Sequence, residues 1–247
     1  MNWYPGENLG YDNLCDFNAV YFINNENGWM VGSLGNILYT NDGGEHWTRT
    51  NTVINSYSSL EDIFFIDESR GWAVGGALYP AETKILYTPD GGNSWIEQLA
   101  PIPSNIVNSV YFTSPVEGWL TTERSVGASF SEILHTPDGG NNWEVQYSID
   151  YDQGTFMDIC FADAFHGWAV GEVGHTYPPP LQSLIYHTWN GGETWMDFSD
   201  IASNAISSVC FTDSQHGWMA GHKVILHTSS GGQVWEDVWT GPHYLRE

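Results

Sequence analysis

One eight-residue pattern recurs five times along this chain of 247 residues and limits what the chain can fold into. The pattern is Thr-x-Asp-Gly-Gly-x-x-Trp, and its third residue is Asp42, Asp90, Asp138, Asn190 or Ser230. A short polar side chain followed by two glycines is typical of a tight turn, because the side chain accepts backbone hydrogen bonds and glycine tolerates positive φ. The pattern therefore predicts five equivalent turns, each joining two strands.

A second pattern precedes each turn, namely a strand-like run that leads into Gly-Trp. The runs read AVYFI, DIFFI, SVYFT, DICFA and SVCFT. One column of these runs is always Phe, and the column two residues earlier is Val or Ile, so both columns share one face of a strand. The Trp that closes each turn then starts a further strand and anchors it in apolar packing. These turn residues are Trp47, Trp95, Trp143, Trp195 and Trp235.

Each repeat thus contains four short strands within about 40 to 50 residues, which is the size of a β-propeller blade. We predict an all-β fold, a β-propeller of four-stranded antiparallel blades in one domain over residues 17–247. The expected blades are about 17–50, 60–99, 107–148, 156–198 and 206–239. We expect five blades in a closed ring, because closure removes sheet edges. The alternative is a five-blade portion of a six- or seven-bladed array.

The first residues and the cysteines give further expectations. Residues 1–16 contain Asn2-Trp3-Tyr4, which resembles a fourth strand, so we expect this segment to cover or close a sheet edge. The three cysteines match no metal or redox spacing. Cys160 and Cys210 occupy one column of the strand-like run, and we expect both to be small buried apolar residues.

The charge balance excludes some partners. There are 30 Asp and Glu against 6 Lys and Arg, a formal net charge of −24, and so acidic a surface repels nucleic acid and anionic lipid. No apolar run approaches membrane-spanning length. The start of the chain lacks the basic and apolar regions of a signal peptide. The Trp-rich, Lys-poor composition nevertheless favours an exported location, extracellular or periplasmic.

The turn pattern resembles the Asp-box, or bacterial neuraminidase repeat. Together with the Phe strand and Gly-Trp-x-Val-Gly, it resembles the propellers of photosystem II stability/assembly factors over about residues 17–239. This resemblance implies a periplasmic, lumenal or secreted propeller that acts as a binding scaffold, with the Asp-boxes structural and on the face away from any active site. A sialidase site needs three converging arginines, whereas Arg49, Arg70, Arg124 and Arg246 fall at different blade positions. The basic patch that the resemblance implies for partner binding is also missing from so acidic a chain.

Loop lengths indicate where a ligand would bind. The loops between the second and third strands are long in blades two to four, at 76–84, 122–132 and 172–183, and short in the other two blades. Such asymmetry on one face predicts a groove, and binding residues concentrate on loops of this kind. The candidate binding residues on these loops and on the links between blades are Tyr57, Tyr79, Glu82, Lys84, Glu123, Arg124, Asp150, Tyr151, Asp152, Glu172, His175 and Tyr177.

Aromatic residues interleaved with carboxylates suit a protein, peptide or glycan ligand. We therefore predict a non-enzymatic binding scaffold, monomeric or part of a longer chain. The alternative is a glycan-active enzyme that uses two carboxylates on the same face. A third interpretation is that the loops are solvated insertions with no dedicated ligand.

We assign no metal and no cofactor. Residues 150–154 begin like a calcium loop but lack its later ligands. The histidines His135, His187 and His227 share a column with Tyr39 and Tyr87, and equivalent positions in successive blades lie too far apart to bind one zinc ion. Phosphate-loop and dinucleotide motifs are absent.

Overall fold

The computed structural model describes residues 16–50, 58–78, 81–100, 105–124, 130–150, 153–173 and 182–240. These residues form five four-stranded antiparallel sheets and two short 3-10 turns, η1 (Ser33–Gly35) and η3 (Ser199–Ile201). Among the described residues, no helix is long and apolar enough to cross a membrane.

The strands follow one another in the order of the sequence repeats. Blade one holds β1 to β4, blade two β5 to β8, blade three β9 to β12, blade four β13 to β16 and blade five β17 to β20. Their bounds are β1 (Phe17–Phe22), β2 (Gly28–Gly32), β3 (Ile37–Thr40), β4 (Thr48–Arg49), β5 (Ser59–Phe65), β6 (Gly71–Leu78), β7 (Ala81–Thr88), β8 (Ile96–Glu97), β9 (Asn105–Phe112), β10 (Gly118–Arg124), β11 (Phe130–Thr136), β12 (Glu144–Asp150), β13 (Thr155–Phe161), β14 (Gly167–Val173), β15 (Gln182–Thr188), β16 (Met196–Asp197), β17 (Ile206–Phe211), β18 (Gly217–Gly221), β19 (Val224–Thr228) and β20 (Glu236–Thr240).

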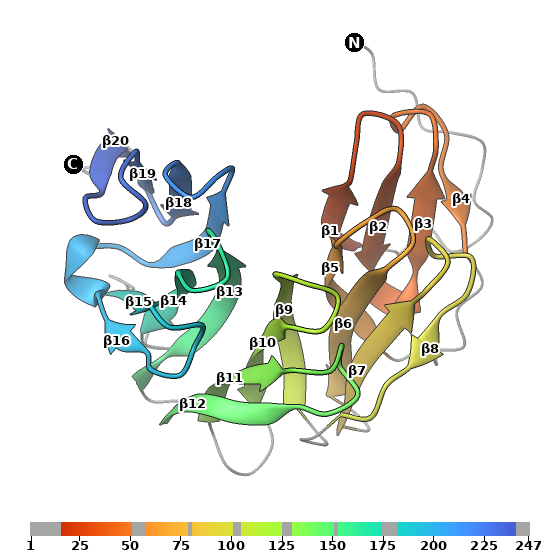
Figure 1. Ribbon diagram of the computed structural model, residues 1–247, viewed down its shortest axis with the longest axis horizontal. Helices are drawn as coiled ribbons and strands as arrows, with labels where there is room; N and C mark the ends of the chain where they lie inside the picture. The colour runs from red at the N-terminus through yellow and green to blue at the C-terminus, as the bar shows by residue number, and fades with distance from the viewer. Residues whose placement is uncertain are drawn as a thin grey trace, which may run out of the picture.

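This architecture confirms the predicted all-β propeller of five four-stranded blades. Within each sheet the strand order follows the chain, so each blade is a meander of antiparallel hairpins. The first strands β1, β5, β9, β13 and β17 contact one another from blade to blade and form the inner side of the assembly, as Figure 1 shows.

The hydrophobic core lies between blades rather than inside one of them. Four clusters fill the four junctions of successive blades. In the first junction Trp29 from blade one stacks on Phe65 from blade two, with ring centroids 3.6 Å apart. The same pair recurs as Trp72 and Phe112 in the next junction, at 3.5 Å. The Gly-Trp motif and the Phe strand are therefore the two halves of one repeated contact.

The Asp-box turns share one hydrogen-bonding scheme. In every copy the Thr hydroxyl accepts from the second glycine N–H, at 2.8–3.0 Å. The Asp oxygen accepts the N–H four residues later, and the Asn190 and Ser230 oxygens do the same, again at 2.8–3.0 Å. Both glycines of each pair have positive φ. These turns leave the end of the third strand, so they lie at the opposite end of each sheet from the loops between strands two and three.

The five blades form an open arc and not the closed ring that we expected. Figure 1 shows blade one and blade five apart at the two ends of the arc. The side chain of Val20 in blade one is 56% exposed, while its equivalents Ile63, Val110, Ile159 and Val209 are at most 4% exposed. Each internal junction is closely packed, so its geometry sets the angle between blades, and among the described residues that angle does not bring the ends together.

The two cysteine predictions have different outcomes. Cys160 is buried in the junction between blades four and five, as expected. The prediction for Cys210 is wrong, because this residue is exposed. Cys210 occupies the same column in blade five, and none of the described strands packs over that face of the blade.

Candidate functional site

Every innermost strand has a β-bulge at the same place in its pairing with the second strand. In β5 the pairing passes from Leu60 with Gly75 to Asp62 with Val74, which leaves Glu61 without an opposite residue. The equivalent bulge residues of the other blades are Asn18, Asn108, Met157 and Ser207. A bulge bends its strand and redirects the extra side chain. The repeats therefore place one side chain per blade at the same level along the inner side of the arc.

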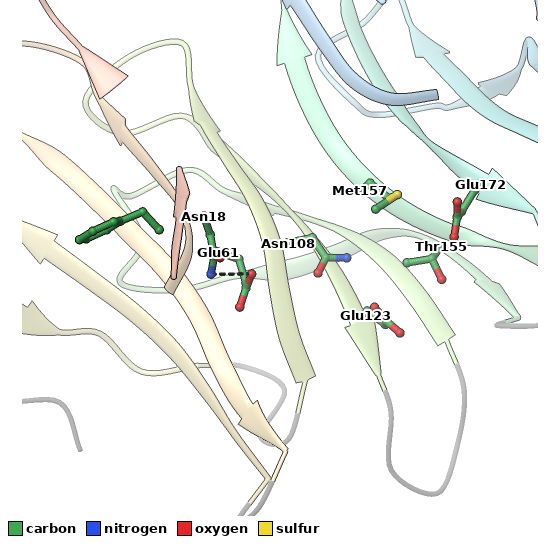
Figure 2. Close-up of a pocket in the computed structure, with 8 residues that line it drawn as sticks. Asn18, Glu61, Asn108, Glu123, Thr155, Met157 and Glu172 are labelled. Carbon is green, nitrogen blue, oxygen red and sulfur yellow. Dashed lines mark hydrogen bonds between the residues drawn. The ribbon is translucent and has the colours of Figure 1, made fainter. Parts of the chain in front are cut away.

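A pocket of about 540 Å³ is built around these bulges, and Figure 2 shows the side chains that line it. It includes four of the five bulge residues, and Glu123 and Glu172 reach it from the second strands β10 and β14. The complete lining is Phe17, Asn18, Glu61, Asn108, Glu123, Thr155, Met157 and Glu172. Second strands end on the face that carries the long loops, so the pocket lies on the predicted face.

Two asparagines fix neighbouring blades to one another beneath the pocket. The Asn18 amide donates to the carbonyl of Leu60 at 2.9 Å and to the carboxylate of Glu61 at 3.1 Å, the latter drawn in Figure 2. The Asn108 amide donates to the carbonyl of Phe156 at 2.8 Å. The pocket wall is thus made of strands that are hydrogen-bonded across blade boundaries, which reduces the entropy lost when a ligand binds.

The pocket carries acidic charge. Its lining includes Glu61, Glu123 and Glu172 and no Lys, Arg or His among the described residues. Clefts lined by one sign of charge concentrate the field, and the net charge of −24 adds to it. Asn18 and Asn108 offer amide donors and acceptors, and Met157 supplies an adaptable apolar contact. The arrangement suits a ligand that brings positive charge or N–H donors together with some apolar surface.

Beside the bulges, two half-buried aspartates lie between the innermost strands. The Ser109 hydroxyl lies 2.9 Å from Asp62 Oδ2 and 2.9 Å from Asp158 Oδ1. A hydroxyl has one hydrogen, so it donates to one carboxyl and can bond the other only by accepting from a protonated group. Burial, followed by the nearby charge of Asp158, raises the pKa of Asp62 to about 7. Burial also raises the pKa of Asp158.

These aspartates also receive backbone hydrogen bonds from neighbouring blades. Asp62 accepts from the N–H of Val110 in blade three at 2.9 Å, and Asp158 accepts from Val209 in blade five at 2.8 Å. The Asp62–Ser109–Asp158 chain therefore links blades two to five directly behind the pocket, and it holds a proton when both hydrogen bonds of Ser109 are made.

The structure brings together only some of the predicted site residues. Glu123 and Glu172 line the pocket. Glu82 and Lys84 form an ion cluster with Glu97 instead, in which Lys84 Nζ donates to the two carboxylates at 2.6 and 2.8 Å. Lys84 is 4% exposed. Burial lowers the pKa of its ammonium, but the hydrogen bonds that it donates to the two glutamates outweigh burial, so the pKa is raised. This cluster ties β7 to β8 and does not line the pocket.

The remaining predicted residues lie elsewhere. Asp150 is the last residue of β12, is exposed and does not line the pocket. Its backbone N–H donates to the side-chain oxygen of Gln153 at 3.0 Å. Arg124 ends β10. Six residues lie outside the described part of the chain, and their placement stays a prediction: Tyr57, Tyr79, Tyr151, Asp152, His175 and Tyr177.

Sequence reasoning missed the bulge residues. It followed the Val or Ile and Phe columns of the innermost strand, whose spacing of two describes a regular strand. The bulge interrupts that spacing two residues before the Val or Ile column. The available signal was the next column, which reads Ala19, Asp62, Ser109, Asp158 and Ser208, because aspartates inside a strand of a buried junction need a special backbone environment.

One group of possible metal ligands occurs on the other face, among the described residues. Asp42, Glu45 and His46 place ligand atoms within 4.8 Å of one another. Asp42 already accepts from the His46 backbone at 2.9 Å and lies 2.7 Å from its ring nitrogen, so the turn itself accounts for this contact. We assign no metal to this exposed acidic cluster.

Repeated four-stranded blades, each with an Asp-box turn between its third and fourth strands, and a pocket on the inner side define this molecule as an Asp-box β-propeller. The family model for the photosynthesis system II assembly factor YCF48 matches residues 51–150 and 145–243. The chain belongs to this family, which confirms the resemblance drawn from its motifs. No curated protein matches the chain.

Several solved structures share the fold. A structure described as YCF48 bound to D1 peptide is 20% identical, covers 91% of this chain and 82% of its own, and has a TM-score of 0.51. The GH74 enzyme of Niastella koreensis is 12% identical with a TM-score of 0.68, and the match covers 91% of this chain but 38% of the enzyme. The GH93 α-L-arabinofuranosidase of Fusarium graminearum is 13% identical, covers 88% of this chain and 77% of its own, and has a TM-score of 0.54. At these identities the likeness shows the fold alone.

Proposed function

We propose that this protein is a non-enzymatic binding scaffold that holds a segment of a partner protein in the pocket framed by the inner-strand bulges. The observation that carries the proposal is the pocket itself, to which carboxylates, amides and apolar groups are contributed by four blades. Family membership supports it. Further support is that a structure of the same fold is described as YCF48 bound to D1 peptide.

The chemistry of the lining indicates what kind of segment fits. An extended peptide presents backbone N–H and C=O groups, and side-chain amides such as those of Asn18 and Asn108 can pair with either. Glu61, Glu123 and Glu172 attract Lys or Arg side chains and repel acidic ones. The proposed ligand is therefore a peptide segment that carries Lys or Arg, which is the opposite polarity from the basic patch implied by the family resemblance.

A matched peptide pair tests this proposal. One synthetic peptide carries Lys and Arg, and its partner has the same length and apolar residues but Glu at those positions. In a calorimetric titration we expect only the basic peptide to bind, and we expect added salt to weaken its affinity. The triple variant Glu61→Gln, Glu123→Gln, Glu172→Gln should lose roughly 10- to 100-fold in affinity, since each lost charged contact is worth about 0.5–1 kcal/mol.

The control is Glu193→Gln, which removes one exposed carboxylate from the Asp-box turn of blade four, on the opposite face. This change should leave peptide affinity within twofold. Equal binding of both peptides, or a triple variant that binds like the wild type, would contradict the proposal.

A glycan-active enzyme is the second candidate, and one observation favours it. Glu123 and Glu172, both predicted from the sequence, line the same pocket as Glu61. Glycosidases use two carboxyl groups about 5–10 Å apart. Turnover on a panel of soluble glycans that disappears in Glu123→Gln or Glu172→Gln would establish this alternative, whereas peptide binding without turnover supports the scaffold.

We also propose that the protein works in an exported compartment, extracellular or periplasmic. The support is its Lys-poor, Trp-rich and acidic composition. Fractionation of the native host with an antibody against the protein tests the location, and recovery in the cytoplasmic fraction alone would overturn it.

A further inference from the structure

A column of side chains runs behind the pocket, one residue after each bulge. Across the five blades it reads Ala19, Asp62, Ser109, Asp158 and Ser208. Asp62 directly follows the bulge residue Glu61, and Asp158 directly follows Met157, and both of these bulge residues line the pocket. The two carboxyl groups of the column are therefore next to the pocket wall.

The position of Ser109 requires a proton on one of these two carboxyl groups. Its hydroxyl oxygen lies 2.9 Å from Asp62 Oδ2 and 2.9 Å from Asp158 Oδ1. With one hydrogen the hydroxyl donates to one carboxyl, and it accepts from the other only if that carboxyl is protonated. The N–H groups of Val110 and Val209 already donate to the pair and supply no further hydrogen to Ser109. Two ionised carboxylates would leave one of the Ser109 contacts without a hydrogen.

The groups around the pair favour this proton. Neither aspartate forms an ion pair with a Lys, Arg or His of the described residues. On the pocket side lie the carboxylates of Glu61, Glu123 and Glu172. The column two residues further along the strands holds Tyr21, Phe64, Tyr111, Cys160 and Cys210, and burial raises the pKa of its hydroxyls and thiols, which stay neutral. Since these groups are neutral or negative, a cation that arrives in the pocket would favour loss of the proton.

We propose that ligand binding and the shared proton are coupled, so that a Lys or Arg side chain entering the pocket releases the proton held by Asp62, Ser109 and Asp158. This coupling rests on the proposed function, because it needs a cationic ligand in the pocket. The carboxyl O–H bond breaks, the proton passes to solvent, and the Ser109 hydroxyl then donates to one carboxylate only. The new negative charge attracts the ligand in return, so the affinity for the ligand rises with pH.

The pH range of this effect follows from the pKa of Asp62, which burial and the charge of Asp158 raise to about 7. Below this pH the free protein holds the proton and loses it when the cation binds, whereas above it the proton has already been lost. If the cation lowers this pKa by about one unit, the affinity changes by about tenfold between the two limits. A carboxyl group in water titrates at about pH 4, so proton release near neutral pH reports this pair.

Calorimetry in two buffers counts the released protons. The basic peptide, with its amino terminus acetylated, is titrated at about pH 6.5 in phosphate and in ACES, whose heats of ionisation differ. We expect the wild type to release about half a proton per peptide, and its affinity to rise about fivefold from about pH 6 to about pH 8. Asp62→Asn should bind the peptide with the same heat in both buffers. Asp158→Asn removes the charge that helps to raise the pKa of Asp62, so it should move proton release to lower pH.

Two controls identify the source of the proton. Glu193→Gln removes an exposed carboxylate on the opposite face and should keep the release. His175→Gln removes a candidate residue outside the described part of the chain and should also keep it, because the proton does not come from a histidine.

The wild-type count does not depend on whether any variant folds. Binding with equal heats in both buffers, release that persists in Asp62→Asn, or release lost in His175→Gln would overturn the coupling and leave the proposed function standing. A wild type that does not bind the basic peptide would overturn both.

Discussion

Replacement of Asp62 by Asn tests whether the aspartates behind the pocket hold a proton near neutral pH. The carboxyl of Asp62 accepts two backbone hydrogen bonds, from Ile63 at 2.8 Å and from Val110 at 2.9 Å, and shares the Ser109 hydroxyl with Asp158. An Asn side chain cannot accept with both of its terminal atoms, so the variant is destabilised by an amount that does not depend on pH.

The pH-dependent part follows from the raised pKa of Asp62. The pKa of Asp62 is 3.8 in the unfolded chain and about 7 in the folded protein. At pH values between these two, the folded state keeps a proton that the unfolded state has lost. The free energy of unfolding therefore falls as pH rises, by about 1.4 kcal/mol per pH unit and ~4 kcal/mol over the whole range. This contribution is fully present below the unfolded pKa and is lost as pH rises through the folded pKa.

The assay is urea unfolding of wild type and Asp62→Asn at a series of pH values from about 4 to about 8. The difference in free energy of unfolding between the two proteins cancels the other titrating groups. It should shift in favour of the variant by ~4 kcal/mol across the range. Asn108→Ala, a neighbour with no titratable group, should show a difference that is constant with pH. A constant difference for Asp62→Asn as well, or a shift in the opposite direction, would refute the shared proton.

Three further changes test other parts of the fold. Burial lowers the pKa of His187 to about 4. As pH falls below 6.5 the unfolded state therefore takes up a proton before the folded state does, which lowers the free energy of unfolding by up to ~3 kcal/mol. His187→Tyr should remove this acid sensitivity, measured by comparing unfolding curves at about pH 4.5 and about pH 7. Thr136→Ala deletes the buried hydroxyl that accepts from Gly140 at 2.9 Å and should cost about 1–2 kcal/mol by urea unfolding, with Thr136→Ser closer to wild type. Trp72→Ala removes the ring stacked on Phe112 and should cost about 3–5 kcal/mol, with a smaller loss for Trp72→Phe; a loss below 1 kcal/mol would show that the junction is not a main source of stability.

The sequence predicted the blades because their determinants are local and repeated. The Asp-box needs one short acceptor and two glycines, and the Phe and Val columns mark one strand face. Both patterns can therefore be recognised within a single repeat. Closure of the ring was not predictable in this way. It depends on the angle between blades, which is set by the fit of rings such as Trp29 on Phe65 across residues far apart in the chain.

The candidate site was predictable in part for a related reason. Glu123 and Glu172 lie near the ends of second strands that the sequence could place, so the face and the two side chains were predicted together. Glu82 and Lys84 were predicted on a long loop at 76–84, but β6 and β7 extend through most of that range and both residues lie in β7. Lys84 pairs there with Glu82 and with Glu97 of the neighbouring strand, a partner that loop length does not reveal. The bulge residues were not predicted because a bulge is a change in the pairing of two strands, and the periodicity of one strand does not show how its partner strand pairs with it.

The two faces of the propeller tolerate substitution differently, and the difference bears on function. In the Asp-box the third residue changes from Asp to Asn190 and Ser230, but the same backbone N–H is accepted at the same distance. At the bulge the backbone irregularity is kept in all five blades, while its side chain is an amide, a carboxylate, a thioether or a hydroxyl. If the bulge position served only the pairing of the strands, the same residue type could occupy it in every blade. Five preserved bulges with dissimilar side chains instead give an irregular chemical surface on a regular frame, which is what the proposed recognition of an asymmetric peptide would require.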